Sequence, residues 1–124
     1  MRTVLIVEDD PVVSESLELA LLILPGIAVR SVSSVEQARD ALSTDERFDA
    51  VITDVHLPGE DGLSLVASML RMPARCNLPV VITTSSREPS IRRRAAEMGV
   101  KAFLEKPWSA KELRNTLHSL FDGT

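Results

Sequence analysis

The chain lacks the features that mark a secreted or membrane-spanning protein. Cys76 is the single cysteine among 124 residues, so no internal disulfide can form, which favours a reducing compartment. The longest apolar run, 19–24, is far shorter than the ~20 residues that span a bilayer. The apolar run that follows Thr3 is too short for the core of a signal peptide. We therefore expect a cytoplasmic protein that contacts no membrane.

The chain also lacks an excess of positive charge. The formal net charge is −4 at pH 7, whereas nucleic-acid-binding surfaces usually carry a basic excess. We therefore expect no direct nucleic-acid binding, and we interpret the basic run 92–94 as a solvated helix face. The composition, 44% hydrophobic and 26% charged, is otherwise that of a globular protein. This length suffices for one domain but not for two, so we expect a single domain over 1–124.

Short apolar runs alternate with helical patterns five times along the chain. The expected strands are 4–7, 27–32, 50–53, 80–83 and 102–104. The expected helices cover 11–24, 35–42, 63–72, 90–98 and 110–121, with Asp10, Ser33 or Ser34, and Ser109 as capping residues. This alternation predicts an α/β protein with a flavodoxin-like, doubly wound parallel sheet of five strands in the order 2-1-3-4-5, covered by five helices.

Three acidic residues follow strands that should be neighbours in this sheet. Glu8 and Asp9 end the first apolar run, and Asp54 ends the third. The ends of these strands border the crevice where the winding reverses, which is where ligands bind in such sheets. Acidic residues also favour helix N-termini, which accounts for Asp10 but not for Asp54. Three carboxylates with no His/Cys cluster nearby favour Mg²⁺ over zinc.

Hydroxyl and ammonium groups follow the other two strands at the same edge. Residues 83–86 read Thr-Thr-Ser-Ser, and Lys106 follows the fifth strand. Alone, such a lysine would be a solvated surface residue and such a threonine a helix cap. Beside an acidic metal site, they supply what a phosphoryl group needs, because an ammonium neutralises its oxygens and a hydroxyl donates a hydrogen bond.

Four segments in this order resemble the receiver domains of bacterial two-component response regulators, including the chemotaxis receiver. They are VLIVEDDP, VITDVHLPGEDGL, LPVVITTSS and GVKAFLEKPW. The resemblance implies that Asp54 accepts a phosphoryl group from the phosphohistidine of a sensor kinase or phosphotransfer protein. It also implies that Asp9 and Asp54 bind Mg²⁺ directly, together with the backbone carbonyl of His56, while Glu8 acts through metal-bound water.

The same resemblance implies a conformational switch. Thr84 and Lys106 lie at the positions of the family's switch hydroxyl and lysine, and Phe103 lies at its aromatic switch position. Phosphorylation would change the surface formed by the fourth helix, the fifth strand and the fifth helix, which would contact an output domain or a downstream protein. The Lys106–Pro107 bond is expected to be cis. The domain would assist only its own phosphorylation and dephosphorylation and is otherwise not an enzyme.

Three residues differ from those common in the family. His56 stands two residues beyond the acceptor, Ser85 replaces the usual alanine after the switch threonine, and Trp108 replaces the commoner phenylalanine after Lys-Pro. Since only the carbonyl of His56 is expected to bind metal, its imidazole is free to alter the access of water to the phosphoryl group. These differences leave the function in place and bear on the lifetime of the phosphoryl group.

Two other classes of protein share part of this pattern. An FMN carrier would need a phosphate-binding loop after the first strand, where the acids 8–10 would repel phosphate. A phosphatase with an aspartate nucleophile would want a second acid two residues later, where His56 stands, and a cap domain. The sequence favours a receiver over both. It leaves open whether the receiver stands alone or is the first domain of a longer regulator.

Overall fold

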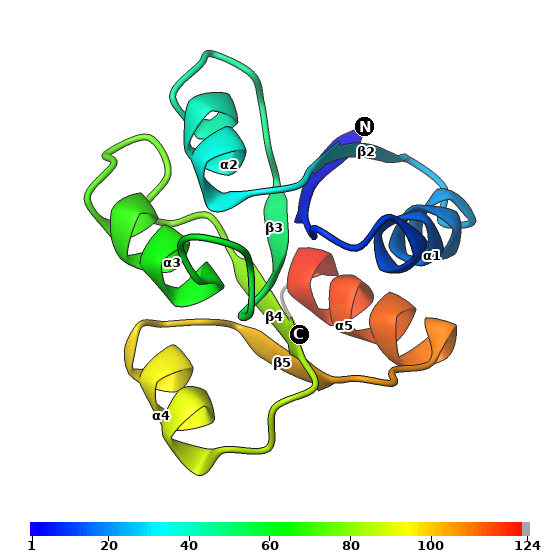
Figure 1. Cartoon of the computed structure of the whole chain (residues 1–124). Helices are drawn as coiled ribbons and strands as arrows, with labels where there is room; N and C mark the ends of the chain where they lie inside the picture. Colours follow the sequence, from blue (N-terminus) through cyan, green and yellow to red (C-terminus); the bar gives the residue numbers. More distant parts are fainter. Residues whose placement is uncertain (123–124) are drawn as a thin grey trace.

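The computed structural model describes residues 1–122, and the sheet has the predicted strand order β2-β1-β3-β4-β5, with all neighbours parallel (Figure 1). Its strands are β1 (Arg2–Val7), β2 (Ile27–Val32), β3 (Ala50–Asp54), β4 (Val80–Thr84) and β5 (Ala102–Glu105). The helices are α1 (Pro11–Leu22), α2 (Val35–Leu42), α3 (Gly62–Leu70), α4 (Pro89–Glu97) and α5 (Ala110–Asp122). The α/β fold class and the flavodoxin-like topology are therefore confirmed.

The sheet is buried on both faces, which explains why its strands are continuous apolar runs. Alternate residues of β1 enter different core clusters: Leu5 and Val7 join α2, α3 and α4 on one face, and Val4 and Ile6 join α1 and α5 on the other. Figure 1 shows the same separation of the helices into two layers. Within residues 1–122, no helix has both the length and the apolar character needed to cross a bilayer.

The helices α1 and α3 each end two residues earlier than the apolar pattern predicts. The pattern extends α1 to residue 24, but the N–H of Leu24 donates to the carbonyl of Leu21, only three residues earlier. The N–H groups of Arg71 and Met72 likewise donate to carbonyls three residues earlier after α3. Such bonds belong to a tighter turn than the α-helix, and apolar periodicity alone does not distinguish the two geometries.

Capping residues define where the helices begin. Asp10 and Ser34 accept hydrogen bonds from N–H groups in the first turns of α1 and α2, as expected. Ser109 and Glu112 form the predicted reciprocal pair at the start of α5. Asp61 caps α3 by accepting from the N–H of Ser64 at 2.8 Å, a role that the sequence analysis missed.

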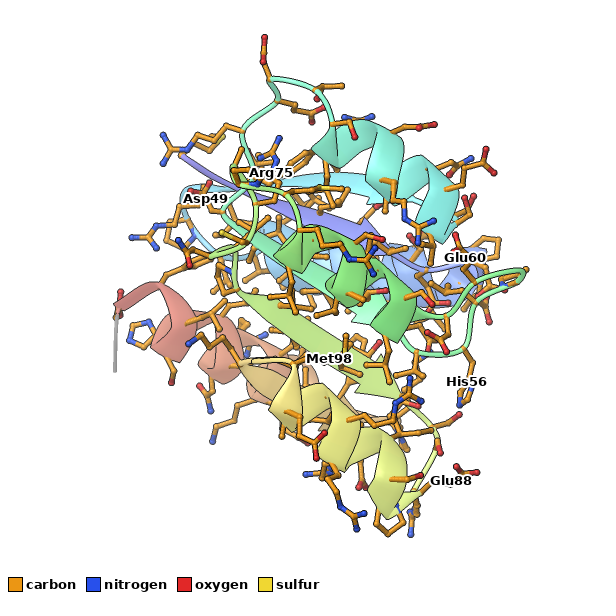
Figure 2. The ribbon with its side chains drawn as sticks, turned by 90° about the vertical axis from the view of Figure 1, so that its left-hand side faces the viewer. Asp49, His56, Glu60, Arg75, Glu88 and Met98 are labelled. Atoms are coloured by element: carbon orange, nitrogen blue, oxygen red, sulfur yellow. The ribbon has the colours of Figure 1, made fainter. Side chains whose placement is uncertain are left out.

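A buried arginine closes the end of the sheet where the strands begin. Arg75 is 8% exposed, and its guanidinium donates to the carbonyls of Leu42, Thr44 and Glu46. The same group lies over the ring of Phe48, 5.2 Å from its centroid. Figure 2 shows Arg75 and Asp49 at the end of the molecule opposite His56. These contacts satisfy a buried charge without a carboxylate partner, and no local sequence pattern indicates them.

Asp49 joins β1 to β3 at this same end. One carboxylate oxygen accepts from the N–H of Thr3 at 2.8 Å, and the other pairs with Arg47 at 3.1 Å. Burial raises the pKa of the Asp49 carboxyl, but the hydrogen bond from Thr3 and the contact with Arg47 outweigh burial, so the pKa lies below its ordinary value. A lowered pKa stabilises the fold above the unfolded pKa, and this contribution is lost as the pH falls through the folded pKa.

We expect Asp49→Asn to lower the free energy of unfolding by about 1 kcal/mol at pH 7, because a neutral amide oxygen accepts more weakly than a carboxylate. The difference from the wild type should begin to shrink as the pH falls through the ordinary carboxyl pKa of about 4, and should shrink further as the folded carboxyl, whose pKa is lower, is protonated too. Urea unfolding of both proteins across this pH range measures the effect. A difference that persists unchanged to the lowest pH would contradict the assignment.

Candidate functional site

The acidic residues predicted from three different positions meet at the carboxyl end of the sheet. β1 and β3 are paired, so Glu8, just beyond β1, lies beside Asp54, the last residue of β3. These two are 3% and 7% exposed, whereas Asp9 is open to solvent. One carboxylate oxygen from each of the three lies within 4.8 Å of the others. The structure therefore assembles the predicted acidic cluster.

Lys106 lies between the two buried acids. Its Nζ donates to Glu8 Oε1 at 3.0 Å and to Asp54 Oδ2 at 2.8 Å. Burial raises the pKa of Glu8 by more than its hydrogen bonds from Lys106 and the Asp10 N–H lower it. Burial lowers the pKa of Lys106, but the hydrogen bonds to Asp54 and Glu8 outweigh burial and raise it. The ammonium therefore stays charged. The peptide bond between Lys106 and Pro107 is cis, as the resemblance implied.

The charges of this cluster fit a divalent cation. With all groups ionised, the ammonium of Lys106 balances only one of the three carboxylates, Glu8, Asp9 and Asp54. Like charges held together in a partly buried site repel strongly, so a doubly charged ion would neutralise the excess. Carboxylate oxygens are ligands that hard cations such as Mg²⁺ and Ca²⁺ prefer. The cluster could therefore hold a metal ion through Glu8, Asp9 and Asp54.

The loop after β3 orients the second oxygen of Asp54. Asp54 Oδ1 accepts from the N–H of His56 at 3.1 Å, so each carboxylate oxygen of Asp54 has a fixed donor. The imidazole of His56 is exposed at this edge of the molecule (Figure 2). Ser85 is also exposed, and Trp108 is half-buried against the core cluster that contains α1 and α5. Of the three residues that depart from the family pattern, His56 reaches Asp54 through its backbone N–H.

Thr84 and Phe103 lie on neighbouring strands. Thr84 ends β4, is fully buried, and accepts from the N–H of Ser86 at 3.0 Å through its hydroxyl oxygen. Its backbone carbonyl accepts from the N–H of Lys106 at 2.8 Å. Phe103 is half-buried on β5, opposite Ile82 of β4, and packs against the core under α4. Thr84 is thus linked directly to Lys106, whereas Phe103 lies farther from the acidic cluster along the sheet.

Gly62 shapes the site, although the sequence analysis assigned it no role. Its N–H donates to the carbonyl of Val55 at 2.9 Å, which folds the loop back over the end of β3. A Cβ atom at this position would lie 2.1 Å from the backbone oxygen of Asp54. No side chain can be accommodated there unless the backbone of the candidate acceptor moves. A glycine directly after the capping residue Asp61 is the pattern that could have indicated this close approach.

Gly62→Ala should therefore lower the free energy of unfolding by about 1–3 kcal/mol, as overpacking does, and should shift the backbone amide resonances of residues 54–56. Gly59→Ala is the comparison in the same loop. A Cβ at Gly59 meets nothing within 4 Å, but its φ of +83° disfavours any side chain, so this variant should lose stability without shifting the resonances of residues 54–56. Urea unfolding and two-dimensional amide NMR of both variants provide the comparison. If Gly62→Ala leaves the resonances of residues 54–56 in place, the contact is not as described.

The fold and the site together define a class of protein. A doubly wound parallel sheet carries an acidic cluster where its winding reverses, and a lysine from the end of β5 reaches two of the acids. The family model for the response regulator receiver domain matches residues 4–118. The chain belongs to this family, the receiver domains of two-component systems, as the four segments predicted. This assignment also sets aside the FMN carrier and the phosphatase.

The chain is also similar to curated regulatory proteins. The chain is 35% identical over 122 residues to the sensory/regulatory protein RpfC of Xanthomonas campestris, and the match covers 97% of this chain and 17% of that protein. It is 35% identical over 119 residues to the transcriptional regulatory protein GltR of Pseudomonas aeruginosa, covering 96% of this chain and 48% of GltR. The chain thus spans less than half the length of either relative.

Solved structures show the same fold. A putative response regulator from Chloroflexus aurantiacus matches with a TM-score of 0.89 and 34% identity, over 98% of both chains. The chemotaxis response regulator CheY4 of Vibrio cholerae matches with a TM-score of 0.87 over 97% of this chain and 98% of CheY4. The identity to CheY4 is 23%, so this second likeness concerns the fold alone.

Proposed function

We propose that residues 1–124 form a single receiver domain whose Asp54 accepts a phosphoryl group in a Mg²⁺-dependent reaction. The donor would be the phosphohistidine of a sensor histidine kinase or of a phosphotransfer protein. The contact that best supports this proposal is the double hydrogen bond of Lys106 to Glu8 and Asp54, because it places a permanent positive charge beside a buried nucleophile. A cytoplasmic location, without membrane or nucleic-acid contacts, belongs to the same proposal and rests on the free Cys76 and the net negative charge.

In the proposed reaction, a carboxylate oxygen of Asp54 attacks the phosphorus atom of the donor. A P–O bond forms, the P–N bond to the donor histidine breaks, and the leaving imidazole keeps the bonding electrons and takes up a proton. The N–H of His56 holds one oxygen of Asp54, which restricts the orientation of the carboxylate before attack. Lys106 can move from Glu8 to a phosphoryl oxygen while its charge is retained. The domain would thus promote only its own phosphorylation and dephosphorylation.

The metal would bind at the acidic cluster. Asp9 and Asp54 are the proposed direct ligands, together with the backbone carbonyl of His56, and Glu8 would act through water. When bound, Mg²⁺ would neutralise the charge that the phosphoryl oxygens bring to an already acidic pocket. The exposure of Asp9 beside two buried acids supports this arrangement, since it leaves one side of the cluster open to the ion and to the donor.

A switch would then carry the change to the surface formed by α4, β5 and α5. The Thr84 hydroxyl accepts a bond from Ser86, so its own hydrogen is available for a phosphoryl oxygen. Movement of Thr84 toward that group would open space for the ring of Phe103, and the surface above β5 would change. This surface would contact an output domain or a downstream protein. The relatives RpfC and GltR have names that denote different regulatory proteins, so we assign no particular output to this chain from them.

The direct test is chemical labelling. With acetyl phosphate and Mg²⁺, intact-protein mass spectrometry should show one added phosphoryl group, which hydroxylamine should remove, as expected for an acyl phosphate. Chelation of Mg²⁺ should prevent labelling, and so should Asp54→Asn. Asp10→Asn is the matched control, because Asp10 adjoins the cluster but caps α1, and it should label like the wild type. Labelling of Asp54→Asn to the wild-type extent would contradict the proposed acceptor.

A further inference from the structure

α4 is attached to the rest of the domain by few contacts. Of its residues, only Ile91 and Ala95 are buried. Side chains cap the starts of α1, α2, α3 and α5, whereas the N-cap of α4, Glu88, makes no such hydrogen bond. Elements with few buried apolar contacts open or shift at low free-energy cost. Each remaining contact of α4 therefore has a large influence on its position.

Arg92 supplies two of these contacts with one side chain. Its guanidinium carbon lies 4.5 Å from the centroid of the Phe103 ring, and its Nη2 donates to Glu105 Oε1 at 3.1 Å. Phe103 and Glu105 are two residues apart on β5, so both point toward the α4 side of the sheet. The basic run 92–94 is exposed, as expected. The sequence pattern of this run does not indicate that Arg92 also contacts β5.

The stacked pair borders open space. Arg92, Phe103 and Lys101 line a cavity of about 180 Å³ between α4 and β5, together with three alanines and Val100. The Phe103 ring packs against the core cluster under α4, and it is stacked by the guanidinium where it lines this cavity. The guanidinium is therefore placed to restrain the ring at the edge of this cavity.

We infer that Arg92 is a positioning residue that holds Phe103 in its resting arrangement and sets how readily phosphorylation changes the surface of α4, β5 and α5. This inference rests on the proposed function. On this inference, movement of the ring toward Thr84 would break its stacking against the guanidinium. A group that binds only one of two arrangements shifts the population toward that one, so Arg92 lowers the population of the active arrangement in the absence of phosphate.

Substitution of Arg92 should release this restraint. In Arg92→Gln without ligand, the amide resonances of α4 and β5 should move part of the way along the path that the wild type follows when Mg²⁺ and beryllofluoride, a mimic of the phosphoryl group, are added. The apparent affinity for beryllofluoride should rise about two- to fivefold, which is the factor that an exposed cation–π contact supplies. Arg92→Lys restores a cation over the ring and should return both readouts toward the wild type.

Arg94→Gln is the matched control. It removes the same charge from the same helix, and Arg94 makes no ion pair or cation–π contact within residues 1–122. It should therefore resemble the wild type in both readouts, and circular dichroism should show that each variant is folded.

The outcomes separate the two proposals. If the wild type binds beryllofluoride and Arg92→Gln behaves like Arg94→Gln, the role of Arg92 is refuted. It is also refuted if Arg92→Gln binds beryllofluoride at Asp54 but loses the response in α4, because Arg92 would then transmit the change rather than restrain it. If the wild type shows no response around Asp54, the proposed function itself fails, and the role of Arg92 fails with it.

Discussion

The hydrogen bonds from Lys106 to Glu8 and Asp54 are the interaction on which the rest of the site depends. Two adjacent carboxylates with little exposure to water repel by roughly 4 kcal/mol at 4 Å, and the ammonium between them offsets this repulsion. The three groups come from the ends of β1, β3 and β5, so the bridge forms only if the sheet has its observed strand order. One ammonium does not balance the third acid, Asp9, and this remaining charge makes the cluster suited to a cation.

The two ends of the sheet carry different kinds of side-chain contact. Where the strands begin, Arg75 and Asp49 satisfy backbone carbonyls and N–H groups and hold the loops closed. Where the strands end, acids and an exposed loop gather around Asp54, and the weakly attached α4 lies beside β5. Loops at the carboxyl ends of parallel strands are where such folds place their ligands, and this chain follows that rule.

Much of this could be predicted from sequence, for a physical reason. Buried parallel strands leave continuous apolar runs, and their carboxyl ends share one edge, so the proximity of Glu8, Asp9 and Asp54 follows from strand order alone. Contacts between distant segments could not be predicted in this way. Arg75 binds carbonyls 29 to 33 residues earlier in the chain, and Gly62 is required by the backbone of Asp54. Neither the contacts of Arg75 nor the close approach at Gly62 produces a periodic pattern in the sequence from which it could be predicted.

In the proposed reaction, Lys106 exchanges one of its two carboxylate partners for the phosphoryl group on Asp54. The most direct measurement is a crystal structure of the protein with Mg²⁺ and beryllofluoride. We expect beryllium bonded to a carboxylate oxygen of Asp54, the ion among the acids of the cluster, and Lys106 Nζ moved from Glu8 to a fluorine atom. A structure in which beryllofluoride is bound to Asp54 while Lys106 Nζ still donates to Glu8 would refute the exchange, and the absence of beryllofluoride from Asp54 at saturating concentration would refute the proposed acceptor.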